Sequence, residues 1–305
     1  MSEPRVVTSR GGGSDPAGGG RKADFRFWND VVGGEGVPYT PRQMNFLGQI
    51  GAGVLGRLGK ASRTTAMVWA VARQSLRPSI WTAPMRNVLA RQVLFTGLEA
   101  TGFVSMIALI VGTLVVVQAQ FWLMRLGQAA LIGPILTAVV LRELGPLLTN
   151  FVVIARSGTA ISTELASMKV HGEVRALDAQ GIDPFVYLVV PRVLGVAAST
   201  FCLTIIFLAV TFIGGFLCLW VIELGDVDVG LFFDNIIGAI GVRDVFSLLA
   251  KSILPGMLTG AICCDEGLAV GAAATEVPIA ATRGVMRSVA SLFVTSLLIS
   301  LMAYL

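Results

Sequence analysis

LIGPILTAVVLRELGPLLTNFVVIARS, residues 131–157, is an apolar stretch interrupted by three charged side chains, Arg142, Glu143 and Arg156. A helix needs roughly 20 apolar residues to cross about 30 Å of hydrocarbon, so this stretch is long enough to span a bilayer. A charge within the bilayer costs at least ~2.5 kcal/mol on insertion scales, so such charges are paired or functional by default. The stretch therefore predicts a membrane-spanning helix that carries a polar site.

Four further stretches are long and apolar enough to span a bilayer. Together, the predicted spans are residues 102–123, 131–157, 194–222, 245–264 and 286–305. The chain of 305 residues is 54% hydrophobic and only 14% charged, which is more apolar surface than one soluble core can bury. We therefore expect an all-α integral membrane protein of about five transmembrane helices, preceded by an interfacial amphipathic elbow helix near residues 84–98.

The N-terminal part of the chain has a different composition. Residues 1–23 are rich in glycine and poor in apolar side chains, which predicts a disordered tail. Residues 24–83 mix basic and aromatic side chains, which predicts an extension lying on the membrane surface. From Arg42 to Arg91 there are eight basic residues and no acidic one, a bias typical of the cytoplasmic side. With five spans, the N-terminus is expected inside and the C-terminus outside.

Letter patterns that indicate catalysis in other proteins do not do so here. Gly51, Gly53 and Gly56 match a dinucleotide fingerprint, but no strand precedes them. Lys60 is not followed by Ser or Thr, so there is no Walker A loop, and any ATP that drives this protein must bind to another chain. The four cysteines lie in apolar runs and His171 is the one histidine, so no metal site and no catalytic triad are expected. The basic residues form no recognised nucleic-acid module.

The charges at Arg142 and Glu143 admit two interpretations. They can neutralise each other or a neighbouring helix, or they can lie beside a polar path or a lipid headgroup, with Arg142 as the counter-charge for a phosphate. Lys251, inside the fourth predicted span, can snorkel or pair with an acid, and Glu143 is a conceivable partner. Residues that we expect to bend the helices as hinges are Gly145, Pro146 and Pro191.

A polar insert, residues 158–184, separates the second and third predicted spans. Its apolar positions recur at roughly helical spacing, which predicts a short amphipathic helix or helix pair. Such a helix on the cytoplasmic side can dock in the groove of a partner, or it can rest on the membrane.

Several of these stretches occur in the order found in one family. The chain reads LRELGP at 141–146, ARSG at 155–158, EL at 164–165, MKV at 168–170, GIDP at 181–184 and YLVVPR at 187–192. In these residues it resembles the MlaE-type, or YrbE-like, permeases that serve mammalian-cell-entry (MCE) phospholipid ABC transporters. The likeness extends more loosely from about residue 90 to the C-terminus.

The resemblance implies that residues 84–305 form a homodimeric permease domain with an elbow helix and five spans. Its implied partners are two cytoplasmic ATPase subunits, a periplasmic MCE ring and a STAS-domain protein on the ATPase. It also implies a lipid cavity between the two permeases, whose candidate residues here are Gln118, Arg142, Glu143, Leu144 and Lys251. The polar insert would couple to the ATPase through Glu164, Met168, Lys169, Glu173, Arg175 and Leu177. No cofactor or metal is expected on this chain, and ATP is expected on the partner ATPase.

One departure from the family pattern lies in the insert. Where the family usually reads Thr-Glu-Gln before Ile-Asp-Ala-Leu, this chain has HGE at 171–173 and VRAL at 174–177. The contact with the ATPase is therefore expected to differ in partner or in strength.

These observations lead us to expect the permease subunit of an ABC transporter that moves phospholipids between the inner and outer membranes, and so acts on outer membrane asymmetry. We expect it in the bacterial inner membrane, without enzymatic activity of its own. One alternative is a secondary transporter of another lipophilic substrate, although such proteins normally show internal repeats and we find none here. The other alternative is a membrane scaffold or sensor that does not transport.

Overall fold

The computed structural model describes residues 46–76, 83–127, 132–222, 229–271 and 273–304. Within those ranges the regular structure is helical and contains no strand. Five of the described helices are long and apolar enough to cross a membrane, namely Met85–Arg125, Gly133–Val170, Phe185–Val221, Val242–Leu268 and Ala274–Ala303. The chain is therefore an all-α, multi-pass membrane protein, as the sequence predicted.

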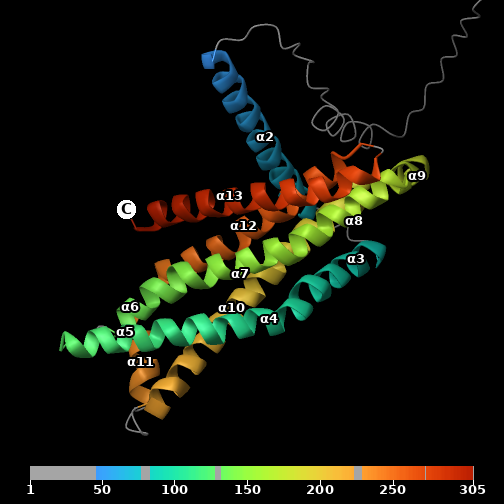
Figure 1. The fold of residues 1–305 in the computed structure, drawn as a ribbon. Helices are drawn as coiled ribbons and strands as arrows, with labels where there is room; N and C mark the ends of the chain where they lie inside the picture. The colour runs from blue at the N-terminus through green and yellow to red at the C-terminus, as the bar shows by residue number, and fades with distance from the viewer. Residues whose placement is uncertain (1–45, 77–82, 128–131, 223–228, 272, 305) are drawn as a thin grey trace, which may run out of the picture. The chain divides into compact units, whose positions relative to one another are not determined.

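The first of these helices joins the elbow helix and the first span, which were predicted as separate elements. Helix α3 (Ala83–Val93), at the position expected for the elbow, continues through a π-helical segment, η2 (Leu94–Leu98), into the expected first span. That span consists of α4 (Glu99–Ile107), the π-helical η3 (Ala108–Gly112) and α5 (Thr113–Arg125). The expected elbow and the first span are thus joined without a break in the helix, and η2 lies where α3 and α4 meet at an angle in Figure 1.

The second spanning helix also extends beyond its expected end. It comprises α6 (Ile132–Leu136), η5 (Thr137–Leu144), α7 (Gly145–Val153), η6 (Ile154–Gly158) and α8 (Thr159–Val170), of which η5 and η6 are π-helical. The first part of the polar insert therefore continues the span as α8. A turn at Gly172, whose φ of 78° suits glycine, leads into the short α9 (Glu173–Ala179). The insert is the helix pair that its apolar spacing predicted.

The described residues from Phe185 onward form three long α-helices and one short α-helix. The π-helical η7 (Phe185–Val189) leads into α10 (Val190–Ile222), and α12 (Val242–Leu268) is followed by η8 (Ala274–Glu276) and α13 (Val277–Tyr304). Each is longer than the span predicted for it. Helix α11 (Val229–Ala239) was not predicted, because it is apolar but too short to span. Its Phe232 packs against Phe216 of α10, with ring centroids 5.6 Å apart.

Helix α12 lies at the centre of the packing, in contact with α13, α10, α8 and α7. Figure 1 shows α13 running back alongside α7 and α8, so that its first residues lie near α9 and its last residues near α6. Small residues allow these close contacts. A Cβ added to Gly260 would lie 2.9 Å from Val193 Cα of α10, and one added to Gly256 would lie 3.2 Å from Ala197 Cα.

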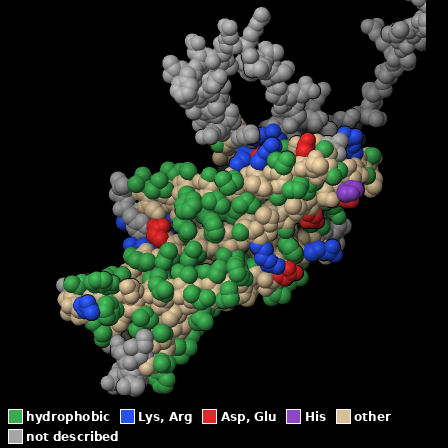
Figure 2. Space-filling view, viewed as in Figure 1, with side chains coloured by type: hydrophobic (Ala, Val, Ile, Leu, Met, Phe, Trp, Pro, Cys, Tyr) green, Lys and Arg blue, Asp and Glu red, His purple; other side chains and the backbone are tan. Residues whose placement is uncertain are grey.

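The surface of the spanning helices is mostly hydrophobic. Figure 2 shows hydrophobic side chains over much of the visible face, whereas charged side chains gather toward the end where Figure 1 places α3, α8 and α9. Exposed large apolar residues such as Phe103, Leu114 and Leu297 belong to this surface. A face of this kind suits contact with lipid rather than with water.

Among the described residues, one helix precedes this bundle. Helix α2 (Phe46–Ser75) falls within the predicted basic extension, residues 24–83. The predicted tail, residues 1–23, and residues 24–45 and 77–82 of the predicted extension lie outside the described residues.

Candidate functional site

The adjacent charges of η5 are paired with other helices rather than with each other. Lys251 Nζ of α12 lies 2.7 Å from Glu143 Oε1, and Ser300 Oγ of α13 donates to the same oxygen at 2.9 Å. The sequence named Glu143 as a conceivable partner of Lys251, and the structure confirms that contact. The site therefore joins the second, fourth and fifth spanning helices.

Arg142 pairs with an acid that the sequence analysis did not single out. Its Nε lies 2.8 Å from Asp244 Oδ1, and its Nη2 donates to Asp244 Oδ2 at 3.2 Å. Asp244 lies in the first turn of α12 and also accepts a hydrogen bond from the Gly241 backbone N–H at 2.9 Å. Since one carboxylate oxygen both caps α12 and binds Arg142, the start of α12 is fixed to η5.

Two prolines explain why α7 and α12 bind each other. Pro146 has no N–H, so the carbonyl of Arg142, four residues earlier, lacks the partner that an α-helix would give it. Lys251 Nζ donates to that carbonyl oxygen at 2.7 Å. Pro255 in α12 frees the carbonyl of Lys251 in the same way, and Asn150 Nδ2 donates to it at 3.1 Å. Each helix supplies the donor that the proline of the other has removed.

The charged groups of this site differ in exposure. The side chains of Lys251 and Asp244 are 1% and 4% exposed, whereas those of Glu143 and Arg142 are 45% and 31% exposed. The buried members therefore hold the two partly exposed ones in place, so that a carboxylate and a guanidinium keep exposed surface within a spanning helix.

The site lies toward one end of the spanning helices. Glu143 is 10 residues after Gly133, the first residue of its spanning helix, which is about 15 Å along the axis. Ser300 is near the last residue of α13 and Asp244 near the first of α12, which places both at the same end. The polar insert lies at the opposite end of the second spanning helix.

The other predicted cavity and hinge residues fall in different surroundings. Leu144 is half-buried beside Glu143, and a Cβ on Gly145 would lie 2.9 Å from Leu208 of α10, so Gly145 permits a close helix contact. The spanning helix stays continuous through Gly145 and Pro146, with the π-helical η5 ending there. Pro191 is buried in the first turn of α10, and the helix continues through it as well.

Gln118 is separate from the charged site. It lines a shallow groove of about 490 Å³ between the first spanning helix and α10, together with Thr113, Gly214 and Cys218. Arg142, Glu143, Leu144 and Lys251 do not line that groove.

The predicted coupling residues divide between α8 and α9. On α8, Glu164 Oε1 lies 2.8 Å from Arg192 Nη2 of α10, and Lys169 Nζ donates to the carbonyl of Leu268, the last residue of α12. Glu164 and Met168 also line a cavity of about 1060 Å³ between α3, α8 and the start of α10. On α9 no residue is buried, and the predicted residues there are Glu173, Arg175 and Leu177. Helix α9 is thus exposed, while α8 is fixed to α10 and α12.

Three residues of this site were not predicted from the sequence, namely Asp244, Asn150 and Ser300. Asp244, Ser247 and Lys251 recur at spacings of three and four and are all buried, so they form one polar stripe along α12. That spacing is readable in the sequence and points to Asp244 as a member of the site. Ser300 gave no such signal, because a serine is common in an apolar helix.

Comparison with known protein families shows to which family the chain belongs. The family model described as Permease MlaE matches residues 89–302, more than two thirds of the chain. The chain belongs to the MlaE permease family. This MlaE permease is 29% identical over 214 residues to a probable ABC transporter permease protein of Rickettsia typhi, which covers 70% of this chain and 82% of that protein. It is 30% identical over 215 residues to one of Synechocystis, which covers 70% of this chain and 81% of that protein.

A plant protein is similar as well. The MlaE permease is 28% identical over 219 residues to the chloroplastic protein TRIGALACTOSYLDIACYLGLYCEROL 1 of Arabidopsis thaliana, which covers 70% of this chain and 61% of that protein. Since the bacterial relatives are named permeases of ABC transporters, this MlaE permease is the transmembrane subunit of such a transporter, which implies ATPase partners.

Proposed function

We propose that this permease carries phospholipids between the inner and outer membranes of a bacterium, driven by a separate cytoplasmic ATPase that binds the ATP. Membership of the MlaE permease family supports transport. Similarity to a plant protein named after the lipid trigalactosyldiacylglycerol supports a lipid substrate. We further propose that the chain lies in the inner membrane with its N-terminus in the cytoplasm and its C-terminus in the periplasm.

The observation that carries the proposal is that Arg142 and Glu143 keep exposed surface within a spanning helix. A phospholipid has an anionic phosphate and two apolar chains, so it needs a charged contact within an apolar surface. The 31% exposed Arg142 supplies a guanidinium, which suits a phosphate, and Asp244 fixes its position. The surrounding apolar residues of the spanning helices suit the acyl chains.

The site is open on one side, which suits a second subunit. Glu143 and Arg142 keep exposed surface although they lie within a spanning helix, and such charges usually face protein or a cavity. We propose that two copies of the chain form a homodimer with a lipid cavity between them at these residues. An MCE ring would then receive the lipid on the periplasmic side, and a STAS-domain protein would act on the ATPase.

The contacts of the polar insert suggest how ATP hydrolysis reaches the site. The exposed α9 would bind the ATPase, and α8 transmits its movement through Glu164 to α10 and through Lys169 to the end of α12. Helix α12 carries Lys251 and Asp244 at its other end. A shift of α8 would therefore move the residues that hold Arg142 and Glu143.

The test is to purify the permease from its native membrane in mild detergent and to quantify proteins and lipids by mass spectrometry. Arg142→Ala alone would remove the guanidinium that faces the buried Asp244 carboxylate, so the sharper variant is Arg142→Gln with Asp244→Asn. We expect wild-type permease to retain phospholipid and to copurify with an ATPase and an MCE-domain protein, and the double variant to lose most of the lipid while keeping the proteins.

Arg125→Gln is the matched control, because Arg125 is exposed over the Phe121 ring at the far end of the first spanning helix. It should retain lipid as the wild type does. Retention of as much phospholipid by the double variant as by the wild type would refute the proposed role of Arg142. A chain that copurifies with no ATPase and no lipid would support the scaffold or sensor instead.

A further inference from the structure

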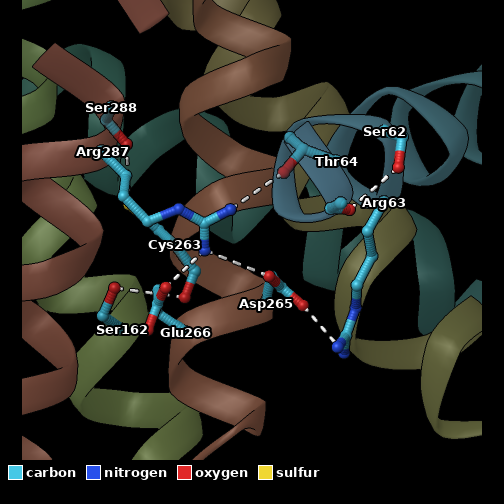
Figure 3. A network of polar contacts seen from close by, with 10 residues as sticks. Ser62, Arg63, Thr64, Ser162, Cys263, Asp265, Glu266, Arg287 and Ser288 are labelled. Atoms are coloured by element: carbon cyan, nitrogen blue, oxygen red, sulfur yellow. Dashed lines mark hydrogen bonds and ion pairs between the residues drawn. The ribbon is translucent and has the colours of Figure 1, made fainter. Parts of the chain in front are cut away.

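Helix α2 makes a polar contact with the bundle that the proposed function does not use. Figure 3 shows Arg63 and Thr64 of α2 beside Asp265 and Glu266, near the end of α12, and Arg287 of α13. Arg63 Nη2 lies 3.0 Å from Asp265 Oδ1, and Arg287 Nη2 donates to Thr64 Oγ1 at 3.2 Å. Arg287 also pairs with Asp265 at 3.3 Å and with Glu266. One network thus joins three helices.

The charges of this network balance only when α2 is present. The side chains of Asp265 and Glu266 are 7% and 8% exposed, so both carboxylates are largely removed from water. Arg287 supplies one positive charge and Arg63 supplies the second. If Arg63 were removed while α2 stayed in place, two buried carboxylates would share a single guanidinium, and an uncompensated buried charge is strongly unfavourable.

Apolar contacts on α2 agree with the polar ones. Thr64, Met67 and Val71 are 4%, 4% and 0% exposed, and their spacing of three and four residues places them on one face of the helix. The opposite face is exposed and includes Trp69, at 74%. The side of α2 that carries Thr64 and the network is therefore also its buried side.

The contact falls where the polar insert joins the bundle. Lys169 of α8 binds the carbonyl of Leu268, three residues after Asp265, so α8 and α2 meet the same end of α12. The family match begins at residue 89, so α2 precedes the matched part of the chain. Its contact with the end of α12 places it where it can affect the movement of α12.

We propose that Asp265 and Glu266 form the binding surface for α2, and that bound α2 restrains the ends of α12 and α13 and so slows the ATP-driven cycle. Release of α2 frees the end of α12 to follow α8. The part of the proposal that concerns the cycle rests on the proposed coupling to an ATPase, whereas the binding of α2 does not.

The test uses the full chain with its ATPase in lipid nanodiscs, in a background with Cys202→Ser and Cys218→Ser. A spin label at Ala61→Cys, on the exposed face of α2, reports whether α2 is bound. Arg63→Glu places a third carboxylate in the network. We expect the label to become mobile and the ATPase rate to rise about fivefold, the lower end of typical coupling between sites.

Two further variants complete the test. Arg73→Glu makes the same charge change on α2 at an exposed position outside the network, and it should leave label and rate unchanged. Arg63→Asp combined with Asp265→Arg restores opposite charges and should restore both readouts. If Arg63→Glu does not fold, Arg63→Gln and Met67→Asp replace it, with the same expectations.

The test distinguishes failure of the binding surface, failure of the restraint and failure of the proposed coupling to an ATPase. An immobile label in every variant that folds would overturn the binding surface, and a released α2 with an unchanged ATPase rate would overturn the restraint. If the wild type shows no ATPase activity at all, the proposed coupling fails, while the spin label still confirms or overturns the binding of α2.

Discussion

At the scale of single residues, Lys251 is the charge on which the membrane site depends. Its Nζ lies 2.7 Å from both the Arg142 carbonyl oxygen and Glu143 Oε1, and its side chain is 1% exposed. An ammonium so deeply buried is tolerated because two acceptors replace its water. Removing the Lys251 ammonium should therefore lower the stability of the protein, because both acceptors lose their donor.

Lys251→Met should destabilise the permease by about 1–3 kcal/mol, because the Arg142 carbonyl loses its donor and Glu143 loses its counter-charge. The measurement is thermal unfolding in detergent, followed by circular dichroism. Combining Lys251→Met with Glu143→Leu should recover part of the loss, because no unpaired carboxylate then remains. If the double variant is as unstable as the single one, Glu143 is not the reason for the cost.

The proline-freed carbonyls give a second prediction at this scale. Asn150→Ala removes the donor to Lys251 O and should cost about 1–3 kcal/mol, the penalty for an unsatisfied buried group. Pro255→Ala restores a backbone N–H four residues after Lys251, so it should be less harmful, or even beneficial, in the Asn150→Ala background. Unfolding of the two single variants and the double variant forms a cycle. Additive effects would show that Asn150 and Pro255 do not share that carbonyl.

At the scale of helices, apolar length and composition predicted the existence of all five spans but not their ends. The helices at Met85–Arg125 and Gly133–Val170 are far longer than the predicted 102–123 and 131–157, since hydropathy reports the apolar part of a helix and not where the helix stops. The partners across helices were harder to predict. Lys251 with Glu143 was anticipated because both are rare intramembrane charges, whereas Arg63 with Asp265 joins residues 202 positions apart in segments with no shared pattern.

The packing of α10 on α12 should be sensitive to one added methyl group. Gly260→Ala places a Cβ 2.9 Å from the backbone of Val193, which cannot move as a side chain can, so we expect a loss of about 1–3 kcal/mol. Gly102→Ala is the control, since nothing lies within 4 Å of its Cβ and alanine is the better helix former. The check is the melting temperature of both variants. Equal stability of the two variants would mean that α10 and α12 can move apart to accommodate the methyl group without loss of stability.

At the scale of the whole molecule, the two ends of the spanning helices differ in chemistry. One end holds Arg142, Glu143 and the start of α12, and the other holds α8, α9 and the network around Asp265. The proposed orientation places the second end in the cytoplasm.

This orientation predicts which positions a reagent can reach. In the background without Cys202 and Cys218, a cysteine at His171 should react with an impermeant maleimide only after the membrane is opened, and one at Gly127 should react in intact cells. The measurement is a gel shift on spheroplasts. Both positions are exposed, so access depends on the side of the membrane and not on burial. Reaction of both from the outside would exclude the five-span topology.

The reciprocal bonds between α7 and α12 limit how the molecule can move. Sliding one helix along the other by a single residue, about 1.5 Å, would pull Lys251 from the Arg142 carbonyl and Asn150 from the Lys251 carbonyl together. The two helices therefore travel as one rigid body during a transport cycle. Opening and closing of the proposed lipid cavity must therefore take place at other helix surfaces that are not joined by such reciprocal hydrogen bonds.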